Sequence, residues 1–299
     1  MKGILLVDKP MDWTSSDVVA VIRRATGIRR CGHTGTLDPM VTGVLPICVG
    51  NATRISEFIM EQGKRYRAYL AFGKKTDSYD AYGTVLETCE IKSFQRDVIE
   101  EVLKKYTGEI KQKPPIYSAK WIDGKRLYQY ALEGKEVDIP EYDVTVYSLD
   151  LIEMKDDGFI FDIHCSKGTY VRSLINDIGE SLGTLAYMKD LVRTGVGAFT
   201  LDECISPDLI KTMPRDEIGS RLISIDQALS NLSRINILEE VTERLENGQK
   251  LNTAKIANEK SIVSGKFSDT YKVFCNGSFI GIGKIEKNIL RMERVLSRD

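Results

Sequence analysis

The stretch CGHTGTLDPMVTGVLP, residues 31–46, places one carboxylate, Asp38, inside a run of Gly, Thr and Pro that suits neither a helix nor a strand. Gly32 and Gly35 free the backbone, and Pro39 restricts the chain directly after the acid. Such a segment displays a side chain on a loop. An Asp before a Pro most often forms a turn with its own backbone. The spacing alone therefore leaves open whether Asp38 only shapes the loop or acts on a ligand.

The composition around this stretch is that of a folded globular protein. The chain has 299 residues, of which 42% are hydrophobic and 28% are charged. Its length exceeds that of one typical domain, so we expect either one large and one small domain or two domains of similar size.

Charge gives no global sign of a nucleic-acid partner, because 42 Lys and Arg balance 43 Asp and Glu for a net charge of −1. Any such binding would rely on local basic clusters, although these are also typical of solvated surface. Three clusters stand out: Arg23, Arg24, Arg29 and Arg30; Lys64, Arg65 and Arg67; and the region 104–126 with seven basic residues.

The spacing of the cysteines and the N-terminal sequence indicate whether to expect a structural metal and where in the cell the protein acts. The six cysteines, at positions 31, 48, 89, 165, 204 and 275, contain no close pair, so we expect no structural metal. The first residues, MKGILLVDKP, are too short an apolar run for a signal peptide or a membrane span. We expect a cytoplasmic protein with reduced thiols.

The periodicity of apolar residues predicts alternating strands and helices. A strand, GILLVDK, should end at Lys9-Pro10, and a helix should follow that is capped by Thr14, Ser15 or Ser16 and closed by Gly27. A helix from Phe94 to Tyr106 should be capped by Ser93 and stopped by Gly108. Further expected elements are a helix from near Asn51, a strand in YRAYLAFG, a hairpin of Val144–Met154 and Phe159–Cys165 around KDDG, a helix of about Tyr170–Leu182 and a strand from Leu191 to Phe199.

The C-terminal part is expected to be a small β module. After Leu201 the chain is irregular, which suggests a connecting region. A second unit should begin near Ile235, with one short helix, Glu239–Glu246, and a hairpin around Asn276-Gly277, since both turn residues accept positive φ.

The usual catalytic sets are missing. His33 and His164 are the only histidines, no G-x-S-x-G motif occurs, and no second acid adjoins Asp38. GHTGTLD also lacks the Lys and the Gly spacing of a phosphate-binding loop. An enzyme with this sequence should work with neither a metal nor a nucleotide cofactor.

Two other segments carry candidate site residues. In CSKGTYVRSLINDIG, residues 165–179, Tyr170 and Arg172 lie at the start of a helix, and Arg172 is a natural partner for a loop carboxylate. In GKRYRAYLAFG, residues 63–73, Tyr66 lies between two arginines, a pattern that suits base stacking next to phosphate contacts. A surface arginine and a core tyrosine remain the alternatives.

Five motifs in order give the chain a recognisable pattern. They are GHTGTLDPMVTGVLPICVGNATR, KRYRAYLAFGKKTDSYDAYG, PPIYSAKWIDGKRLY, CSKGTYVRSLINDIG and YMKDLVRTGVGAF. Together they resemble the TruB family of tRNA pseudouridine synthases, over roughly Gly3 to Phe199 and more weakly in the tail.

The resemblance implies an isomerase that converts uridine to pseudouridine at position 55 in the T loop of tRNA, and that also assists tRNA folding. Asp38 matches the family's catalytic aspartate, and Tyr66 matches the tyrosine that stacks on the extruded uracil. No cofactor is implied, because isomerisation imports no group. Whether Asp38 attacks the sugar, attacks the base or removes a proton stays open.

The resemblance also assigns the remaining site residues. Tyr170 matches the active-site tyrosine, Arg172 the arginine that pairs with the aspartate, and Leu191 an apolar residue that packs on the target. His33 matches a histidine near the flipped nucleotides. Lys9 matches a lysine whose role we interpret as supporting the site.

The fold implied is α+β, with a central mixed, largely antiparallel sheet flanked by helices. We expect a catalytic domain at 1–232 and a PUA-like RNA-binding domain at 235–299. The expected partner is tRNA, with no membrane association. The protein is expected to act as a monomer that requires neither a guide RNA nor a protein partner. A tail that only packs on the catalytic domain is the alternative. The basic residues of this tail are Lys284, Lys287, Arg291, Arg294 and Arg298.

Three departures from the family pattern bear on RNA affinity more than on catalysis. Asp12 stands where Gly is usual, and Leu132 stands where a basic residue is often found. Trp121 stands where a Lys commonly follows the YSA motif, with Lys120 one place earlier. A non-catalytic RNA-binding module and a guide-dependent synthase of the H/ACA type remain alternatives.

Overall fold

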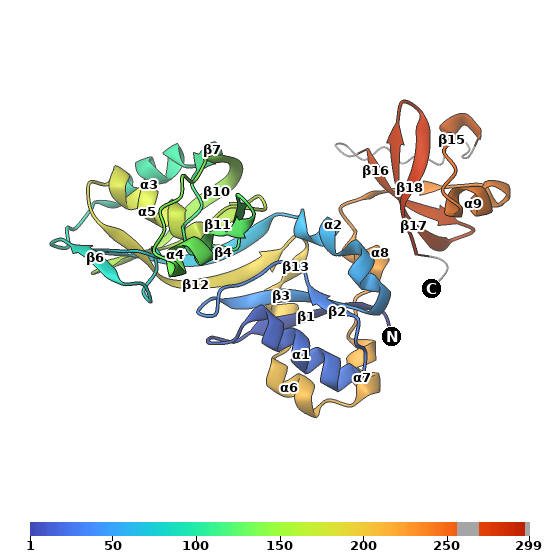
Figure 1. Cartoon of the computed structure of the whole chain (residues 1–299), viewed down its shortest axis with the longest axis horizontal. Helices are drawn as coiled ribbons and strands as arrows, with labels where there is room; N and C mark the ends of the chain where they lie inside the picture. The colour runs from blue at the N-terminus through green and yellow to red at the C-terminus, as the bar shows by residue number, and fades with distance from the viewer. Residues whose placement is uncertain (256–268, 297–299) are drawn as a thin grey trace.

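A computed structural model describes residues 1–255 and 269–296 of the chain. The two largest sheets are a nine-stranded sheet in the N-terminal two thirds and a five-stranded sheet at the C-terminus (Figure 1). Two short two-stranded sheets accompany them, β5 (Lys74–Thr76) with β6 (Val85–Thr88) and β8 (Trp121–Ile122) with β9 (Lys125–Arg126). Arg298, one of the predicted basic residues of the tail, lies outside the described residues.

The large sheet is mixed and largely antiparallel, which confirms the expected α+β class. All its pairings are antiparallel except the one between β12 and β3. The strand order is β1 (Gly3–Lys9), β3 (Thr42–Val49), β12 (Ala186–Val196), β4 (Lys64–Phe72), β11 (Gly158–Cys165), β10 (Tyr142–Lys155) and β7 (Gly108–Gln112), with β2 (Cys31–His33) beside β3 and β13 (Phe199–Thr200) beside β12.

Most of the predicted helices are present. The helix α1 (Ser15–Thr26) begins at a capping box formed by Thr14 and Asp17 and ends at Gly27 with φ 68°, as the sequence indicates. The helix α5 (Val171–Ser181) lies within one residue of its predicted bounds. The helix expected near Asn51 begins as a 3-10 turn, η1 (Gly50–Ile55), and continues as α2 (Ser56–Met60).

Two helix predictions need correction. In α3 (Arg96–Lys105) the N-cap is Gln95, which makes no side-chain bond, so Ser93 does not cap this helix. The region after Leu201 is not irregular, because its Ser and Pro residues start short helices rather than break structure. These are η2 (Leu201–Glu203), α6 (Pro207–Thr212) capped by Ser206, α7 (Arg215–Ser220) after Pro214, and α8 (Ile225–Ala228) capped by Ser224.

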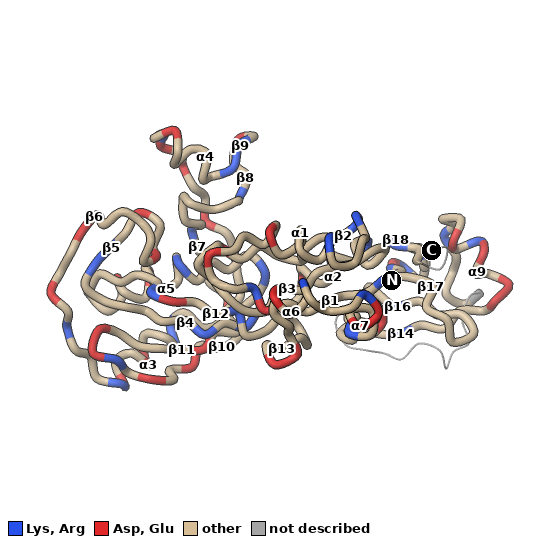
Figure 2. The backbone as a smooth tube through the Cα atoms, turned by 90° about the horizontal axis from the view of Figure 1, so that it is seen from below, with Lys and Arg blue, Asp and Glu red and all other residues tan. Residues whose placement is uncertain are grey.

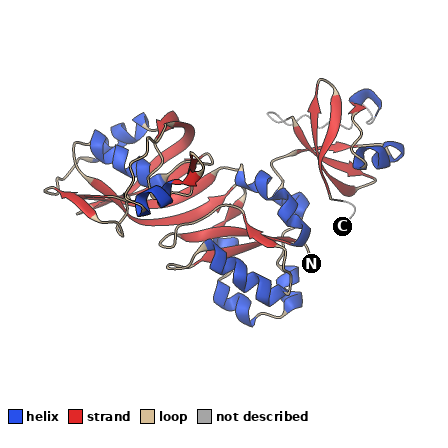
Figure 3. Ribbon diagram, viewed as in Figure 1, coloured by secondary structure: helices blue, strands red, loops and turns tan. Residues whose placement is uncertain are grey.

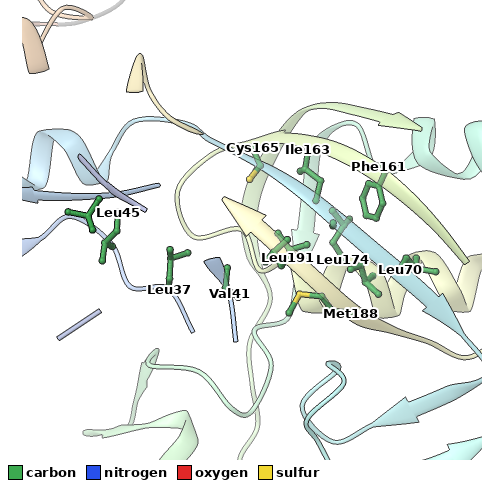
Figure 4. Close-up of a cluster of buried hydrophobic side chains, with 14 of the residues drawn as sticks. Leu37, Val41, Leu45, Leu70, Phe161, Ile163, Cys165, Leu174, Met188 and Leu191 are labelled. Carbon is green, nitrogen blue, oxygen red and sulfur yellow. The ribbon is translucent and has the colours of Figure 1, made fainter. Parts of the chain in front are cut away.

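Helices cover different parts of the large sheet. The helices α3 and α5 lie against the half that contains β10, β11 and β4, whereas α1, α6 and α7 lie beside β1 and β2 (Figure 3). One buried apolar cluster joins both halves, and Figure 4 shows its side chains around β12 and β4, including Leu70, Ile163, Leu174 and Met188. The predicted hairpin around KDDG is present as β10 and β11.

The segment between β7 and β10 leaves the body of the molecule. It carries β8 (Trp121–Ile122), β9 (Lys125–Arg126) and α4 (Leu127–Leu132). Figure 2 shows these three elements projecting from one side of the large sheet. Its side chains include Trp121 and Leu132, which are 59% and 76% exposed.

The C-terminal sheet has the order β14 (Ser233–Asn236), β16 (Thr270–Cys275), β17 (Ser278–Glu286), β18 (Ile289–Val295) and β15 (Leu251–Asn252). The predicted helix is α9 (Glu239–Glu246), and the predicted hairpin is present, with Asn276 and Gly277 at φ 47° and 79°. Ile282 of β17 and Leu296, directly after β18, pack with Ile55 and Ile59 of the η1–α2 segment. The β module is therefore joined to the rest of the chain by apolar contacts.

Candidate active site

The loop that carries Asp38 is held from both sides by buried neighbours. Leu37 and Val41 belong to the main apolar cluster, which draws the backbone inward on either side of Asp38 (Figure 4). The hydroxyl of Ser15 accepts a hydrogen bond from the Leu37 backbone N–H at 2.9 Å. The Asp38 side chain remains 40% exposed. A loop rich in Gly and Pro is thus made rigid by packing, with one carboxylate left at the surface.

Lys9 supports the same loop from below. Its side chain is fully buried, and its ammonium donates to the backbone oxygens of Pro10 at 2.9 Å, Trp13 at 2.7 Å and Pro39 at 2.9 Å. Burial lowers the pKa of Lys9 to about 8. Because Pro39 directly follows Asp38, this contact fixes the backbone next to the carboxylate. Lys9 does not line the cavity, and its supporting role remains a prediction.

Arg172 makes the contact with Asp38 that the sequence led us to expect. It is 7% exposed in its side chain, and Nη2 lies 2.9 Å from Asp38 Oδ2. The same guanidinium donates to the backbone oxygen of Tyr117 at 2.8 Å and to that of Ser78 at 3.1 Å. Four contacts, one of them to a second acid, Asp80, therefore orient Arg172.

Asp80 is a site residue that the sequence reasoning missed. It is 1% exposed and lies 3.5 Å from Arg172 Nη1 through Oδ2. Its other oxygen accepts hydrogen bonds from the Ser78 hydroxyl at 2.7 Å and from the Tyr82 backbone N–H at 3.0 Å. Asp38, Arg172 and Asp80 form one row of alternating charge. No local spacing relates Asp80 to Arg172, which lies 92 residues further along the chain.

A cavity of about 700 Å³ opens beside this row. Its lining includes five of the predicted residues, namely Asp38, Tyr66, Tyr170, Arg172 and Leu191. They come from the loop before β3, from β4, from the start of α5 and from β12, so the sheet brings together residues up to 153 positions apart. The volume lies in the range of sites that enclose a small molecule or a single base.

The two tyrosines are positioned by different means. Tyr66 lies on β4 between strands β11 and β12, opposite Ile163 and Arg193. Tyr170 is the N-cap residue of α5, where the Gln112 side chain accepts from its backbone N–H at 2.8 Å and donates to its backbone oxygen at 3.1 Å. Burial raises the pKa of both phenols, so each stays a neutral ring with a hydroxyl at neutral pH.

Arg193 is a second cavity residue that the sequence reasoning missed. It is 2% exposed, donates from Nε to the Val44 oxygen at 2.7 Å and from Nη2 to the Gly35 oxygen at 3.3 Å, and forms a side-chain hydrogen bond with Tyr66. Burial lowers its pKa. A usable signal was present, since Arg193 lies two residues after Leu191 on a strand and shares its face.

The structure does not bring His33 into the cavity lining. Its neighbour Thr34 lines the cavity, whereas Nδ1 of His33 is buried and finds no hydrogen-bond partner within residues 1–255 and 269–296. Burial, and then the charge of Arg193, lower the pKa of His33. A role for His33 near bound nucleotides therefore remains a prediction.

Two of the three departures from the family pattern, Asp12 and Trp121, lie next to the Asp38 loop or the cavity. Asp12 adopts φ 63°, the left-handed conformation that favours glycine, and its backbone N–H donates to the Pro39 oxygen at 2.9 Å. Lys120 and Trp121 line the cavity, and the Trp121 ring lies 5.3 Å from the Arg126 guanidinium. Leu132 is exposed on α4.

Neither a metal cluster nor a membrane span is found in the described part of the chain. No three His, Cys, Asp or Glu side chains are grouped so as to hold a metal ion. No helix there is long and apolar enough to cross a membrane.

The chain is similar to known proteins over most of its length. Residues 23–171 match the family described as TruB family pseudouridylate synthase (N terminal domain), and residues 172–230 match the tRNA pseudouridylate synthase B C-terminal domain. The chain is 43% identical to tRNA pseudouridine synthase B of Geobacillus thermodenitrificans over 83% of this chain and 85% of the relative. It is 41% identical to the protein of that name from Caldanaerobacter subterraneus over 98% of both chains.

The fold is shared with solved structures as well. The structure resembles a chain of the crystal structure of a Cbf5-Nop10-Gar1 complex with a TM-score of 0.76 and 25% identity, covering 98% of this chain and 84% of that one.

Proposed function

Because this chain belongs to the TruB family of pseudouridylate synthases, we propose that it isomerises uridine to pseudouridine at position 55, in the T loop of tRNA, with Asp38 as its one catalytic carboxylate. Membership makes the chain an isomerase, and the names of its relatives support tRNA as the substrate. The observation that carries the proposal is the row Asp38–Arg172–Asp80 at the edge of a cavity bordered by Tyr66 and Leu191.

Pseudouridylation needs the groups that this cavity offers. The bond from ribose C1′ to uracil N1 breaks, the base turns, and a new bond joins C1′ to C5. C5 then loses its proton to solvent and N1 gains one, so nothing is oxidised or reduced. A single carboxylate can promote this by attack on the sugar, by attack on the base or by removal of a proton. Asp38 is exposed enough to reach a ligand, and Arg172 holds it in one orientation.

The cavity walls suit a base that has left its stack. An extruded nucleotide loses stacking energy of a few kcal/mol, which an aromatic platform and an apolar wall offset. Tyr66 supplies a neutral ring and Leu191 an apolar surface in the same cavity. Tyr170 adds a second ring at the start of α5. In this proposal the three side chains hold the uracil while Asp38 acts on it.

The proposal includes a domain organisation. Residues 1–232 would form the catalytic domain and residues 235–299 a PUA-like RNA-binding domain, and the protein would act as a monomer that also assists tRNA folding. The contact of Ile282 and Leu296 with the η1–α2 segment supports a module held in one place relative to the cavity, since Met60 at the end of α2 lines that cavity.

Tritium release from C5 of uridine tests the proposal directly. Purified protein should release tritium from an unmodified tRNA transcript, and a transcript with cytidine at position 55 should release none. Asp38→Asn should lower turnover by at least about 10⁴-fold while tRNA binding survives. Substantial turnover by Asp38→Asn would remove Asp38 from the chemistry.

A second candidate is a guide-dependent synthase, which the likeness to the Cbf5-Nop10-Gar1 complex favours. The two candidates differ in what must be added. Turnover of tRNA by the purified chain alone supports the stand-alone enzyme. Turnover only after addition of guide RNA and protein partners would support the second candidate instead.

A further inference from the structure

In two of the basic groups that the sequence suggested for nucleic-acid binding, the β4 cluster and the tail, most of the described basic side chains have partners within the folded chain. Lys64 is buried and donates to the backbone oxygens of Met60 and Gln62. Arg67, on the same strand, pairs with Asp162 at 2.8 Å. In the other clusters the ion pairs are Lys111–Asp143, Lys125–Glu133, Lys284–Glu286, Arg291–Glu293 and Arg294–Glu57.

The first cluster differs from the β4 cluster and from the tail, whereas in region 104–126 only Lys111 and Lys125 of the seven basic residues pair with a carboxylate of the described chain. Arg23, Arg24, Arg29 and Arg30 are exposed, and within the described chain none of them forms an ion pair with a carboxylate. Their side-chain hydrogen bonds go to neutral acceptors only. Arg23 donates to the Cys31 oxygen at 2.9 Å, and Arg30 donates to the Thr53 hydroxyl at 2.7 Å and to the Asn51 side chain at 3.0 Å. We call these four residues the arginine surface.

The helix dipole explains only half of this surface. Arg23 and Arg24 lie in the last turn of α1, where a cation stabilises the helix by about 0.3–1 kcal/mol. Gly27 then ends the helix, so Arg29 and Arg30 lie beyond it and gain nothing from the dipole. The helix dipole therefore does not explain why four positive charges lie within eight residues. No carboxylate of the described chain pairs with them.

The position of the arginine surface relates it to the cavity. Arg30 precedes β2, and Thr34 directly after that strand lines the cavity. Four residues of extended chain span about 13 Å. Figure 2 shows the basic segments at α1 and β2 on the same side of the molecule as the projecting β8–β9–α4 segment and β18. A ligand in the cavity that continues along this side would meet the arginines.

We propose that the arginine surface binds the phosphates of the base-paired RNA stem that adjoins the flipped nucleotide, an inference that rests on the proposed function. A guanidinium makes two parallel hydrogen bonds to a phosphate, and its charge supplies affinity without reading sequence. The surface has no exposed large apolar side chain between residues 23 and 30, which a protein interface would need at its centre. An RNA backbone is therefore the partner that fits.

The test removes the charges of Arg24 and Arg29, whose side chains make no polar contact that stabilises the described part of the fold. Neither Arg24 nor Arg29 uses its side chain in a hydrogen bond or an ion pair with the rest of the described protein. For Arg24→Gln/Arg29→Gln, the plot of log affinity for unmodified tRNA against log salt should become shallower by about 1.5. At about 0.1 M salt the affinity should fall about five- to tenfold, and turnover at saturating tRNA should stay within about twofold of the parent chain.

A matched control removes two charges from the other end of the molecule. Lys104 and Lys105 are exposed and occupy the last turn of α3, as Arg23 and Arg24 do in α1. Tyr106 next to them donates to the Asp177 oxygen near the end of α5, whereas the cavity lies at the start of α5. Lys104→Gln/Lys105→Gln should leave the salt slope unchanged, which shows that net charge alone is not responsible.

Two outcomes would overturn the assignment. One is an unchanged salt slope in the arginine variant, and the other is an equal reduction of the slope in both variants. The proposed function is judged separately by tritium release from the parent chain. A parent chain that binds tRNA with the arginine-dependent slope but releases no tritium would retain the surface and refute the enzyme.

Discussion

Arg172 and Arg193 are both buried and line the same cavity, but their surroundings differ. Arg172 lies between two carboxylates, Asp38 at 2.9 Å and Asp80 at 3.5 Å. Arg193 has only neutral partners, the Val44 and Gly35 oxygens and the Tyr66 side chain, and no ion pair with any carboxylate of the described residues. One side of the cavity carries a compensated charge and the other an uncompensated one.

The difference indicates that Arg172 and Arg193 have different roles. The positive charge of Arg172 is largely balanced by the two acids beside it, so it attracts a ligand only weakly. Its hydrogen bonds instead orient the two acids. A buried cation without a counter-ion keeps a positive potential in the cavity, which would attract a phosphate or negative charge that develops on a base. The pKa values follow the same contrast, since Arg193 lowers the pKa of Lys9, Lys64 and His33 after the larger effect of their burial.

The largest effect on stability and turnover is expected from replacing Arg172, the arginine that lies between two carboxylates. Arg172→Met should remove the partner of buried Asp80 and of Asp38, and breaking a buried ion pair in this way costs about 3–5 kcal/mol. We expect a loss of about 3 kcal/mol in the free energy of unfolding by urea and a fall in turnover of at least about 10²-fold, because Asp38 loses its orientation.

Asp80 supplies the control for that result. The double variant Arg172→Met/Asp80→Asn removes both buried charges, so it should regain part of the lost stability while turnover stays low. Equal unfolding free energies for the single and double variants would contradict the view that Asp80 is left as an unpaired buried charge.

A second, smaller effect is expected on the uncompensated side. Arg193→Met removes a desolvated charge and also leaves its neutral acceptors unpaired, and these terms oppose each other. We expect the free energy of unfolding to change by less than about 1.5 kcal/mol, in contrast to Arg172→Met. Turnover should fall by about 10²-fold, the loss typical of removing one stabiliser of developing negative charge.

Two comparison variants make that expectation specific. Arg193→Lys keeps the charge and should restore a part of the turnover. Arg65→Met alters an arginine of the same sheet that donates to the Phe199 oxygen at 3.3 Å and does not line the cavity. It should leave turnover within about threefold of the parent chain. If Arg193→Met loses as much stability as Arg172→Met, the two arginines do the same structural work and the contrast between them fails.

The same two arginines show how far the sequence reached. Arg172 could be paired with Asp38 in advance, because it stands in a motif whose role follows from the family resemblance. Arg193 stands in another quoted motif, but its partners lie at Gly35 and Val44, 158 and 149 residues away. Contacts of that kind depend on strand order, and the pairing of β12 with β3 could not be chosen from periodicity alone.

Local signals predicted local structure well where they were specific. The cap candidates for α1, which included Thr14, its predicted end at Gly27 and the Asn276-Gly277 turn gave correct boundaries, because each depends on residues within a short stretch of chain. The Ser and Pro residues after Leu201 were interpreted as breaks although they start helices, since the same residue types serve both purposes. Asp12 shows the reverse case, a residue in a conformation for which the resemblance suggested Gly.

The smallest expected effect concerns Asp177 on α5. Among the described residues, Asp177 forms no ion pair with an arginine, just as Arg193 forms none with a carboxylate. Burial raises the pKa of Asp177 to about 6. Between about pH 4 and pH 6 the unfolded chain loses this proton and the folded chain keeps it, so this residue makes stability fall as the pH rises. Above about pH 6 the folded chain carries the full penalty of the buried charge.

Asp177→Asn removes that penalty and keeps the shape of the side chain. Because Asp177 is partly exposed, we expect the variant to be more stable than the parent by about 1–2 kcal/mol at pH 8, with the difference vanishing below about pH 4. Urea unfolding at a series of pH values measures this, with Asp156→Asn in the exposed turn between β10 and β11 as the control. A stability difference between Asp177→Asn and the parent that is the same at pH 4 and pH 8 would mean that the charge of Asp177 costs the folded chain no stability. An unpaired buried charge would then carry no penalty in this fold, and the distinction between Arg172 and Arg193 would lose its physical basis.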